Sequence, residues 1–129
     1  MAEQGTRFPA LPVVLLVDDE PALLDSIGQE LQGTCRLFTA ASAEKADLLL
    51  AARRYDVVVC DHMLPGEQGL DFLGKIMEMM PSTKRILVTG YTSPEFISRS
   101  MAIAGLSACL VKPVRASEIA AAIRTALGS

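Results

Sequence analysis

The chain has 129 residues, of which half are hydrophobic and 21% are charged, a composition typical of one globular domain. Its net charge of −3 argues against direct binding to nucleic acid or to an anionic membrane, and no apolar run approaches the length of a membrane span. Residues 1–12 contain no apolar signal-peptide core, so we expect a cytoplasmic protein. We also expect a disordered leader over residues 1–10 and one domain over residues 11–129.

Strand and helix patterns alternate along the chain. In chain order they predict a strand at Val13–Val17, a helix from Pro21 to about Leu31, a strand at Cys35–Ala40, a helix capped by Ser42 that runs to about Arg53, a strand at Val57–Asp61, a helix at Gly69–Met80, a strand at Arg85–Thr89, a helix at Pro94–Ala104, a strand at Ala108–Lys112 and a helix at Ala116–Leu127. This rhythm predicts an α/β fold in which a parallel five-stranded sheet carries helices on both faces.

The strands differ in their apolar character. Val57–Asp61 is a continuous apolar run that ends in a carboxylate, and such a run is typical of a strand buried on both faces of a parallel sheet. Cys35–Ala40 is the least apolar strand, so we expect it at an edge of the sheet. The three cysteines, Cys35, Cys60 and Cys109, fall in expected strands. Their odd number and the absence of a CxxC motif favour buried thiols over a disulfide or a metal site.

Polar side chains stand at four strand ends, where an apolar sheet needs none. Asp18 and Asp19 follow the first strand, and Asp61 ends the third. Thr89 ends the fourth strand, and Lys112 lies at the end of the fifth. Because the carboxyl ends of parallel strands share one edge of a sheet, we expect these five side chains to converge on the crevice where such sheets bind ligands.

The acidic residues predict a metal site. Three carboxylates in one cleft repel one another unless a cation offsets their charge, and an all-oxygen site with open water positions suits Mg²⁺. We expect Asp19 and Asp61 to bind the ion directly, and Asp18 to act through water or to orient the site. The backbone carbonyl of Met63 is expected to supply a further oxygen.

The same residues predict phosphoryl transfer to Asp61, with formation of an acyl phosphate. That reaction needs alignment and charge neutralisation on the transferring oxygens. The ammonium of Lys112 supplies charge as a compact point cation, and the Thr89 hydroxyl can donate a hydrogen bond to a phosphoryl oxygen.

Taken together in this order, these motifs resemble the receiver domain of two-component response regulators. The matching segments are Val17-Asp18-Asp19-Glu20, Asp61 with Leu64-Pro65-Gly66 and Gly69-Leu70, Val88-Thr89-Gly90, and Val111-Lys112-Pro113. The resemblance implies a flavodoxin-like (βα)5 doubly wound sandwich with strand order 2-1-3-4-5. By position, it makes Asp61 the phosphoacceptor, Asp18 and Asp19 the acidic pair, Thr89 the switch hydroxyl and Lys112 the phosphate-contacting lysine.

The resemblance also implies how such a domain works. A sensor histidine kinase or a phosphotransfer protein would donate the phosphoryl group from a phosphohistidine, and Mg²⁺ would be required. The domain would assist its own phosphorylation and dephosphorylation without acting as an enzyme on an external substrate. It would then control a partner or an attached output domain. The last two helices and the fifth strand would form the surface that passes the signal on. A homodimer would form through the same surface.

One position departs from the family pattern. The family commonly places Tyr or Phe three residues before the lysine, and Cys109 stands there. We hypothesise that Tyr91 covers the pocket instead and tunes access to the phosphorylated aspartate. A second hypothesis is a cis bond between Lys112 and Pro113. His62 is expected to fill space beside Asp61 and not to take part in the chemistry.

Three alternative functions can be weighed against these residues. A phosphatase with an aspartate nucleophile needs a second acid two residues later, where Met63 stands. A flavin-binding electron carrier of the same fold needs a first loop rich in Ser, Thr and Gly, and here that loop is acidic. A receiver that has lost switching and only docks partners is kept open by Cys109.

Overall fold

The computed structural model describes residues 11–91 and 93–128, so the leader expected over residues 1–10 lies outside the described residues. The elements are β1 (Val13–Val17), α1 (Pro21–Leu31), β2 (Arg36–Ala40), α2 (Ala43–Ala52), β3 (Val57–Asp61), α3 (Gly69–Met79), β4 (Lys84–Thr89), α4 (Pro94–Ile103), β5 (Ala108–Val111) and α5 (Ala116–Leu127). In these residues, no helix has both the length and the apolar character that crossing a membrane requires.

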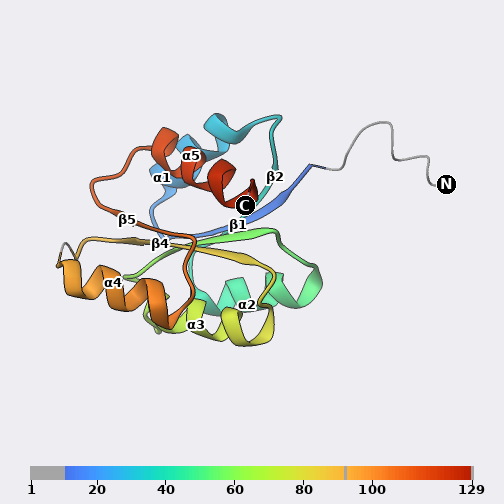
Figure 1. Cartoon of the computed structure of the whole chain (residues 1–129). Helices are drawn as coiled ribbons and strands as arrows, with labels where there is room; N and C mark the ends of the chain where they lie inside the picture. The colour runs from blue at the N-terminus through green and yellow to red at the C-terminus, as the bar shows by residue number, and fades with distance from the viewer. Residues whose placement is uncertain (1–10, 92, 129) are drawn as a thin grey trace.

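The strands form one parallel sheet in the order β2-β1-β3-β4-β5, which confirms the predicted fold and places β2 at an edge. Helices α1 and α5 cover one face of the sheet, and α2, α3 and α4 cover the other (Figure 1). All strands run in the same direction, so their carboxyl ends lie along a single edge.

The core consists of two layers, one on each side of the sheet. Along β3, Val58 and Cys60 pack into the layer under α2, α3 and α4, whereas Val57 and Val59 pack into the layer under α1 and α5. Successive side chains of a strand point to opposite faces, so a strand that is buried on both faces is apolar along consecutive positions, as Val57, Val58, Val59 and Cys60 are. This is why β3 reads as an uninterrupted apolar run.

Several element boundaries differ from the prediction by one or two residues. Cys35 lies outside β2, because pairing with β1 begins at Arg36. Lys84 belongs to β4, because it pairs with Val57 at the start of β3. Lys112 lies beyond β5, because pairing with β4 ends at Val111.

Local signals explain where two helices begin. The Ser42 hydroxyl accepts a hydrogen bond from the backbone N–H of Lys45 at the start of α2 (3.2 Å), as predicted. The Ser93 hydroxyl accepts one from the N–H of Phe96 at the start of α4 (3.3 Å). Pro94 follows this cap, at a position where its missing N–H costs no helical hydrogen bond.

Candidate functional site

The three carboxylates meet at the carboxyl edge of the sheet. Asp18 and Asp19 follow β1, Asp61 ends β3, and each offers an oxygen within 4.8 Å of the oxygens of the other two. Asp18 and Asp61 are buried, with 2% and 4% of their surface exposed, while Asp19 is exposed. The pocket therefore has two fixed carboxylates at its base and one at its mouth.

Hydrogen bonds hold the buried carboxylates in place. The Lys112 ammonium lies 3.0 Å from Oδ2 of Asp61, which joins the end of β5 to the end of β3. The other oxygen of Asp61, Oδ1, accepts a hydrogen bond from the N–H of Met63 (3.3 Å). Oδ1 of Asp18 accepts one from the N–H of Glu20 (2.8 Å). Each carboxylate is thus oriented by its own following loop.

The electrostatics of the pocket favour an added cation. Burial raises the pKa of Asp18, the charges of Asp61 and Asp19 raise it further, and the hydrogen bond from Glu20 and the charge of Lys112 oppose the rise. Burial alone would lower the pKa of Lys112, but its hydrogen bond and charge interaction with Asp61 raise it overall. One ammonium faces three carboxylates, and carboxylate oxygens are the ligands that hard divalent cations prefer. The donor set therefore fits Mg²⁺.

Thr89 and the following loop border the pocket. The Thr89 side chain is fully buried, and its Oγ1 accepts a hydrogen bond from the backbone N–H of Tyr91 (3.1 Å). The carbonyl of Thr89 accepts a hydrogen bond from the N–H of Lys112 (2.8 Å), which ties the ends of β4 and β5 together. The Lys112–Pro113 bond is cis, as predicted.

Cys109 lies in β5 and is half-buried against the layer under α4. Burial raises the pKa of its thiol, which favours the neutral form of the side chain. Cys35 and Cys60 are also free thiols whose pKa is raised by burial. The prediction of buried thiols is therefore confirmed for Cys60 alone, since Cys35 and Cys109 are half-buried, and Cys35 precedes its strand instead of lying in it.

Two features of the site were not predicted from the sequence. The first is a cluster of three rings formed by His62, Tyr91 and Phe96, which pack edge to face beside the acceptor loop. The second is the tight approach of Gly69 to the backbone of Asp61 and His62. The order Gly69-Leu70 after the aspartate belonged to the family motif, but only the folded loop shows what the glycine contacts.

Replacing Asp18 with asparagine is expected to stabilise the metal-free protein at neutral pH. The folded pKa of Asp18 lies above its unfolded value, so the ionised carboxylate costs stability, and this cost disappears as the pH falls through the folded pKa. Asparagine keeps the oxygen that accepts the bond from Glu20 and carries no charge. The urea midpoint of Asp18→Asn should exceed that of wild type at neutral pH, and the difference should shrink on acidification.

The matched control is Asp25→Asn on the exposed side of α1, for which we expect no comparable gain. An equal or lower midpoint for Asp18→Asn at neutral pH, in the absence of divalent cations, would contradict this account of the pocket.

Fold and site together define a CheY-like signalling domain, in which a parallel sheet of this strand order presents an acidic pocket at its carboxyl edge. The sequence model of the response regulator receiver domain matches residues 14–124. The chain therefore belongs to the receiver domain family of two-component systems.

Known proteins agree with this assignment. The hydrogenase transcriptional regulatory protein HoxA of Cupriavidus necator is 36% identical over 100 residues, which cover 78% of this chain and 21% of that protein. The transcriptional activator DevR/DosR of Mycobacterium tuberculosis is 30% identical over 115 residues, which cover 86% of this chain and 52% of that protein. The chain thus spans between a fifth and about half of these relatives.

Solved structures match over nearly the whole described chain. The receiver domain of an HD domain-containing protein from Pseudomonas fluorescens Pf-5 is 34% identical, with a TM-score of 0.82 over 92% of this chain and 95% of that one. A CheY-like receiver domain from Methanospirillum hungatei JF-1 is 32% identical, with a TM-score of 0.81 over 92% and 95% of the two chains. The BeF3-activated DrrB receiver domain is 28% identical, with a TM-score of 0.80 over 92% and 99%.

Proposed function

We propose that Asp61 accepts a phosphoryl group from a phosphohistidine on a sensor histidine kinase or phosphotransfer protein. The observation that carries this proposal is a buried carboxylate that pairs with Lys112 at 3.0 Å and lies beside two further acids. A bond forms between an oxygen of Asp61 and phosphorus, the bond from phosphorus to the donor imidazole nitrogen breaks, and the donor returns to free histidine.

The chain's own residues would align and stabilise this transfer. The Lys112 ammonium already lies at Asp61, where it can offset negative charge on the transferring oxygens. The Thr89 hydroxyl stands at the end of the neighbouring strand β4 and can turn to donate a hydrogen bond to a phosphoryl oxygen. Little covalent help is needed, because phosphoryl transfer depends chiefly on positioning and charge.

Asp18, Asp19, Asp61 and the backbone carbonyl of Met63 would hold Mg²⁺. When bound, the ion would neutralise charge on the phosphoryl oxygens. Two of these carboxylates are buried, and among the residues that the structure describes Lys112 is the one ammonium paired with them, which supports the proposal.

The proposed role is that of a switch. The domain would assist its own phosphorylation and later hydrolysis, without turning over an external substrate, and would change conformation to control a partner or an attached output domain. Three further expectations stay predictions: one domain over residues 11–129, a cytoplasmic location, and a homodimer through α4, β5 and α5.

Incubation with acetyl phosphate and Mg²⁺, followed by intact-mass measurement, tests the acceptor. Wild type should gain one phosphoryl group, and Asp61→Asn should gain none because its amide is not a nucleophile of this kind. The control Asp71→Asn removes an exposed acid from the first turn of α3 and should be labelled like wild type. An unlabelled wild type, or labelling that persists in Asp61→Asn, would overturn the assignment.

A further inference from the structure

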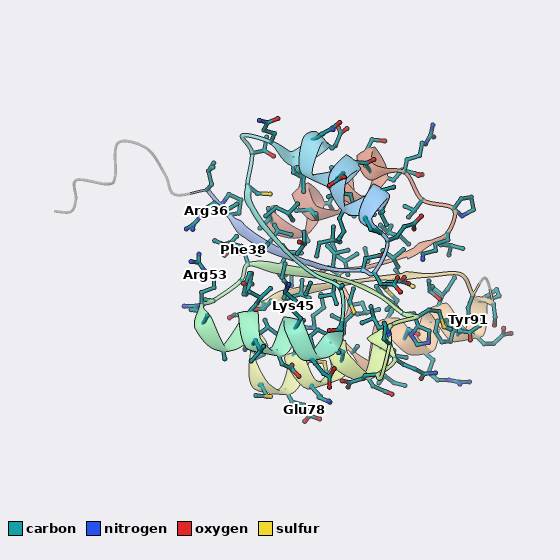
Figure 2. The ribbon with its side chains drawn as sticks, turned by 180° about the vertical axis from the view of Figure 1, so that it is seen from behind. Arg36, Phe38, Lys45, Arg53, Glu78 and Tyr91 are labelled. Atoms are coloured by element: carbon teal, nitrogen blue, oxygen red, sulfur yellow. The ribbon has the colours of Figure 1, made fainter. Side chains whose placement is uncertain are left out.

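Three rings join the acceptor loop to the first turn of α4. The centroid of the His62 ring lies 5.6 Å from that of Tyr91 and 5.4 Å from that of Phe96, and the last two rings are 5.0 Å apart. The interplanar angles of 65° to 67° are those of edge-to-face pairs, the geometry that aromatic rings favour. In Figure 2, Tyr91 lies beside the start of α4, at the end of the molecule opposite Arg36 and Arg53.

The first route from the pocket to these rings runs through Asp61. His62 follows Asp61 directly, and only 2% of its surface is exposed. Its Nδ1 accepts a hydrogen bond from the N–H of Leu70 in α3 (3.3 Å), so the imidazole is held on one side by α3 and on the other by the two rings. A displacement of the backbone at Asp61 therefore moves a ring that is already packed on Phe96.

The second route runs through Thr89. The hydroxyl of Thr89 now accepts the hydrogen bond from the N–H of Tyr91 at 3.1 Å. A hydroxyl that turns toward a phosphoryl oxygen on Asp61 gives up this bond. The backbone of Tyr91 is then released, and because the residue is 49% exposed, its ring is free to leave the rings of His62 and Phe96.

We propose that His62, Tyr91 and Phe96 are the positioning residues that transmit phosphorylation of Asp61 to α4, in place of an aromatic residue on β5. This inference rests on the proposed function of Asp61. Cys109 is half-buried in β5 and has no ring, so it cannot make the contacts that the three rings make. Phe96 is the partner on α4 itself, because it belongs to the first turn of that helix and contacts both other rings.

The proposed transmission from Asp61 through His62, Tyr91 and Phe96 to α4 is called the relay below. Amide hydrogen exchange of α4, measured with and without acetyl phosphate and Mg²⁺, tests it. In wild type we expect the backbone amides of residues 95–103 to exchange about tenfold faster after phosphorylation, because the first turn of α4 loses its ring contacts. Phe96→Leu and Tyr91→Leu should still gain the phosphoryl group by intact mass, yet lose this response. Tyr91→Phe keeps the ring and should restore it. Ile103→Ala removes an exposed apolar side chain at the other end of α4 and should respond like wild type.

A second readout follows Tyr91 directly. The chain has two tyrosines and no tryptophan, and the buried hydroxyl of Tyr55 has no hydrogen-bond partner among the described residues. Tyr55→Phe therefore removes no bond and leaves Tyr91 as the sole fluorophore. Its quenching by acrylamide should rise about twofold on phosphorylation, since the ring becomes more exposed.

The outcomes separate this inference from the proposed function. The relay would be overturned if α4 of the phosphorylated protein did not exchange faster, or if the leucine variants responded like wild type. Either result would leave the proposed function of Asp61 intact. If Asp61 gains no phosphoryl group, the proposed function fails, and the relay fails with it.

Discussion

Replacing Gly69 with alanine is expected to lower the free energy of unfolding by about 3 kcal/mol and to slow phosphorylation of Asp61. Gly69 is the first residue of α3, and its N–H donates to the carbonyl of His62 at 2.8 Å. A Cβ built at this position would overlap the carbonyl oxygen of Asp61 and would lie 2.8 Å from the carbonyl carbon of Asp61 and from Cα of His62. These are backbone atoms of the acceptor residue and its neighbour, so relief of the overlap must displace the acceptor itself.

The same helix supplies the control. Gly74 lies in the middle of α3, and a Cβ there would meet no atom within 4 Å. Gly74→Ala should therefore stabilise the protein by about 0.5–1 kcal/mol, the gain in helix propensity. Urea unfolding and the time course of phosphorylation by intact mass would compare the two variants. Equal stability of Gly69→Ala and Gly74→Ala would refute the role assigned to this close approach.

Replacing Arg85 with methionine is expected to cost about 3 kcal/mol of unfolding free energy. The guanidinium is buried near the C-terminal end of α4, and burial lowers the pKa of Arg85. It donates to the carbonyls of Ala104 (2.9 Å), Gly105 (3.1 Å) and Thr83 (2.6 Å). Methionine fills similar space but donates no hydrogen bond, so the buried carbonyls of Thr83 and Ala104 lose this donor.

Arg85→Lys should recover only part of the lost unfolding free energy. An ammonium is a compact point charge and cannot reproduce the planar array of N–H donors of the guanidinium. Arg99→Met on the exposed side of α4 is the control and should change the unfolding free energy by less than about 0.5 kcal/mol. Urea unfolding measures all three variants. A loss for Arg85→Met no larger than that for Arg99→Met would show that these hydrogen bonds do not anchor α4.

The parts of the fold that follow from hydrophobic pattern could be predicted from the sequence. A strand buried on both faces is apolar along consecutive positions, so Val57–Asp61, an apolar run that ends in a carboxylate, was recognisable without a structure. Because all strands are parallel, the polar residues that end them had to share one edge, and Asp18, Asp61 and Lys112 do meet there. These inferences need only the period of the pattern and the direction of the strands.

Contacts that depend on loop geometry could not be predicted in this way. His62 and Phe96 are far apart in sequence, and only the folded loops bring their rings to 5.4 Å. Arg85 was assigned to a strand correctly, but a pattern of apolar residues does not show that a charged side chain is buried against the carbonyls of the loops around it.

Among the described residues, β2 and β5 are the outer strands of the sheet, and each has one edge that pairs with no other strand. Such an edge could in principle pair with a strand of a second copy of this chain. On β2, the exposed Arg36 opens the strand, and Arg36 and Arg53 both lie over the ring of Phe38, at 5.6 Å and 4.4 Å (Figure 2). Their charges oppose edge-to-edge pairing with a second, identical strand.

On the opposite side, β5 has only four residues and is followed at once by Lys112 and Pro113, whose ring nitrogen carries no hydrogen to donate. A continuous intermolecular sheet is therefore disfavoured at both edges. A dimer that used this side of the molecule, as predicted for α4, β5 and α5, would be built from side chains and not from strand pairing, so surface substitutions could tune its strength without disturbing the sheet.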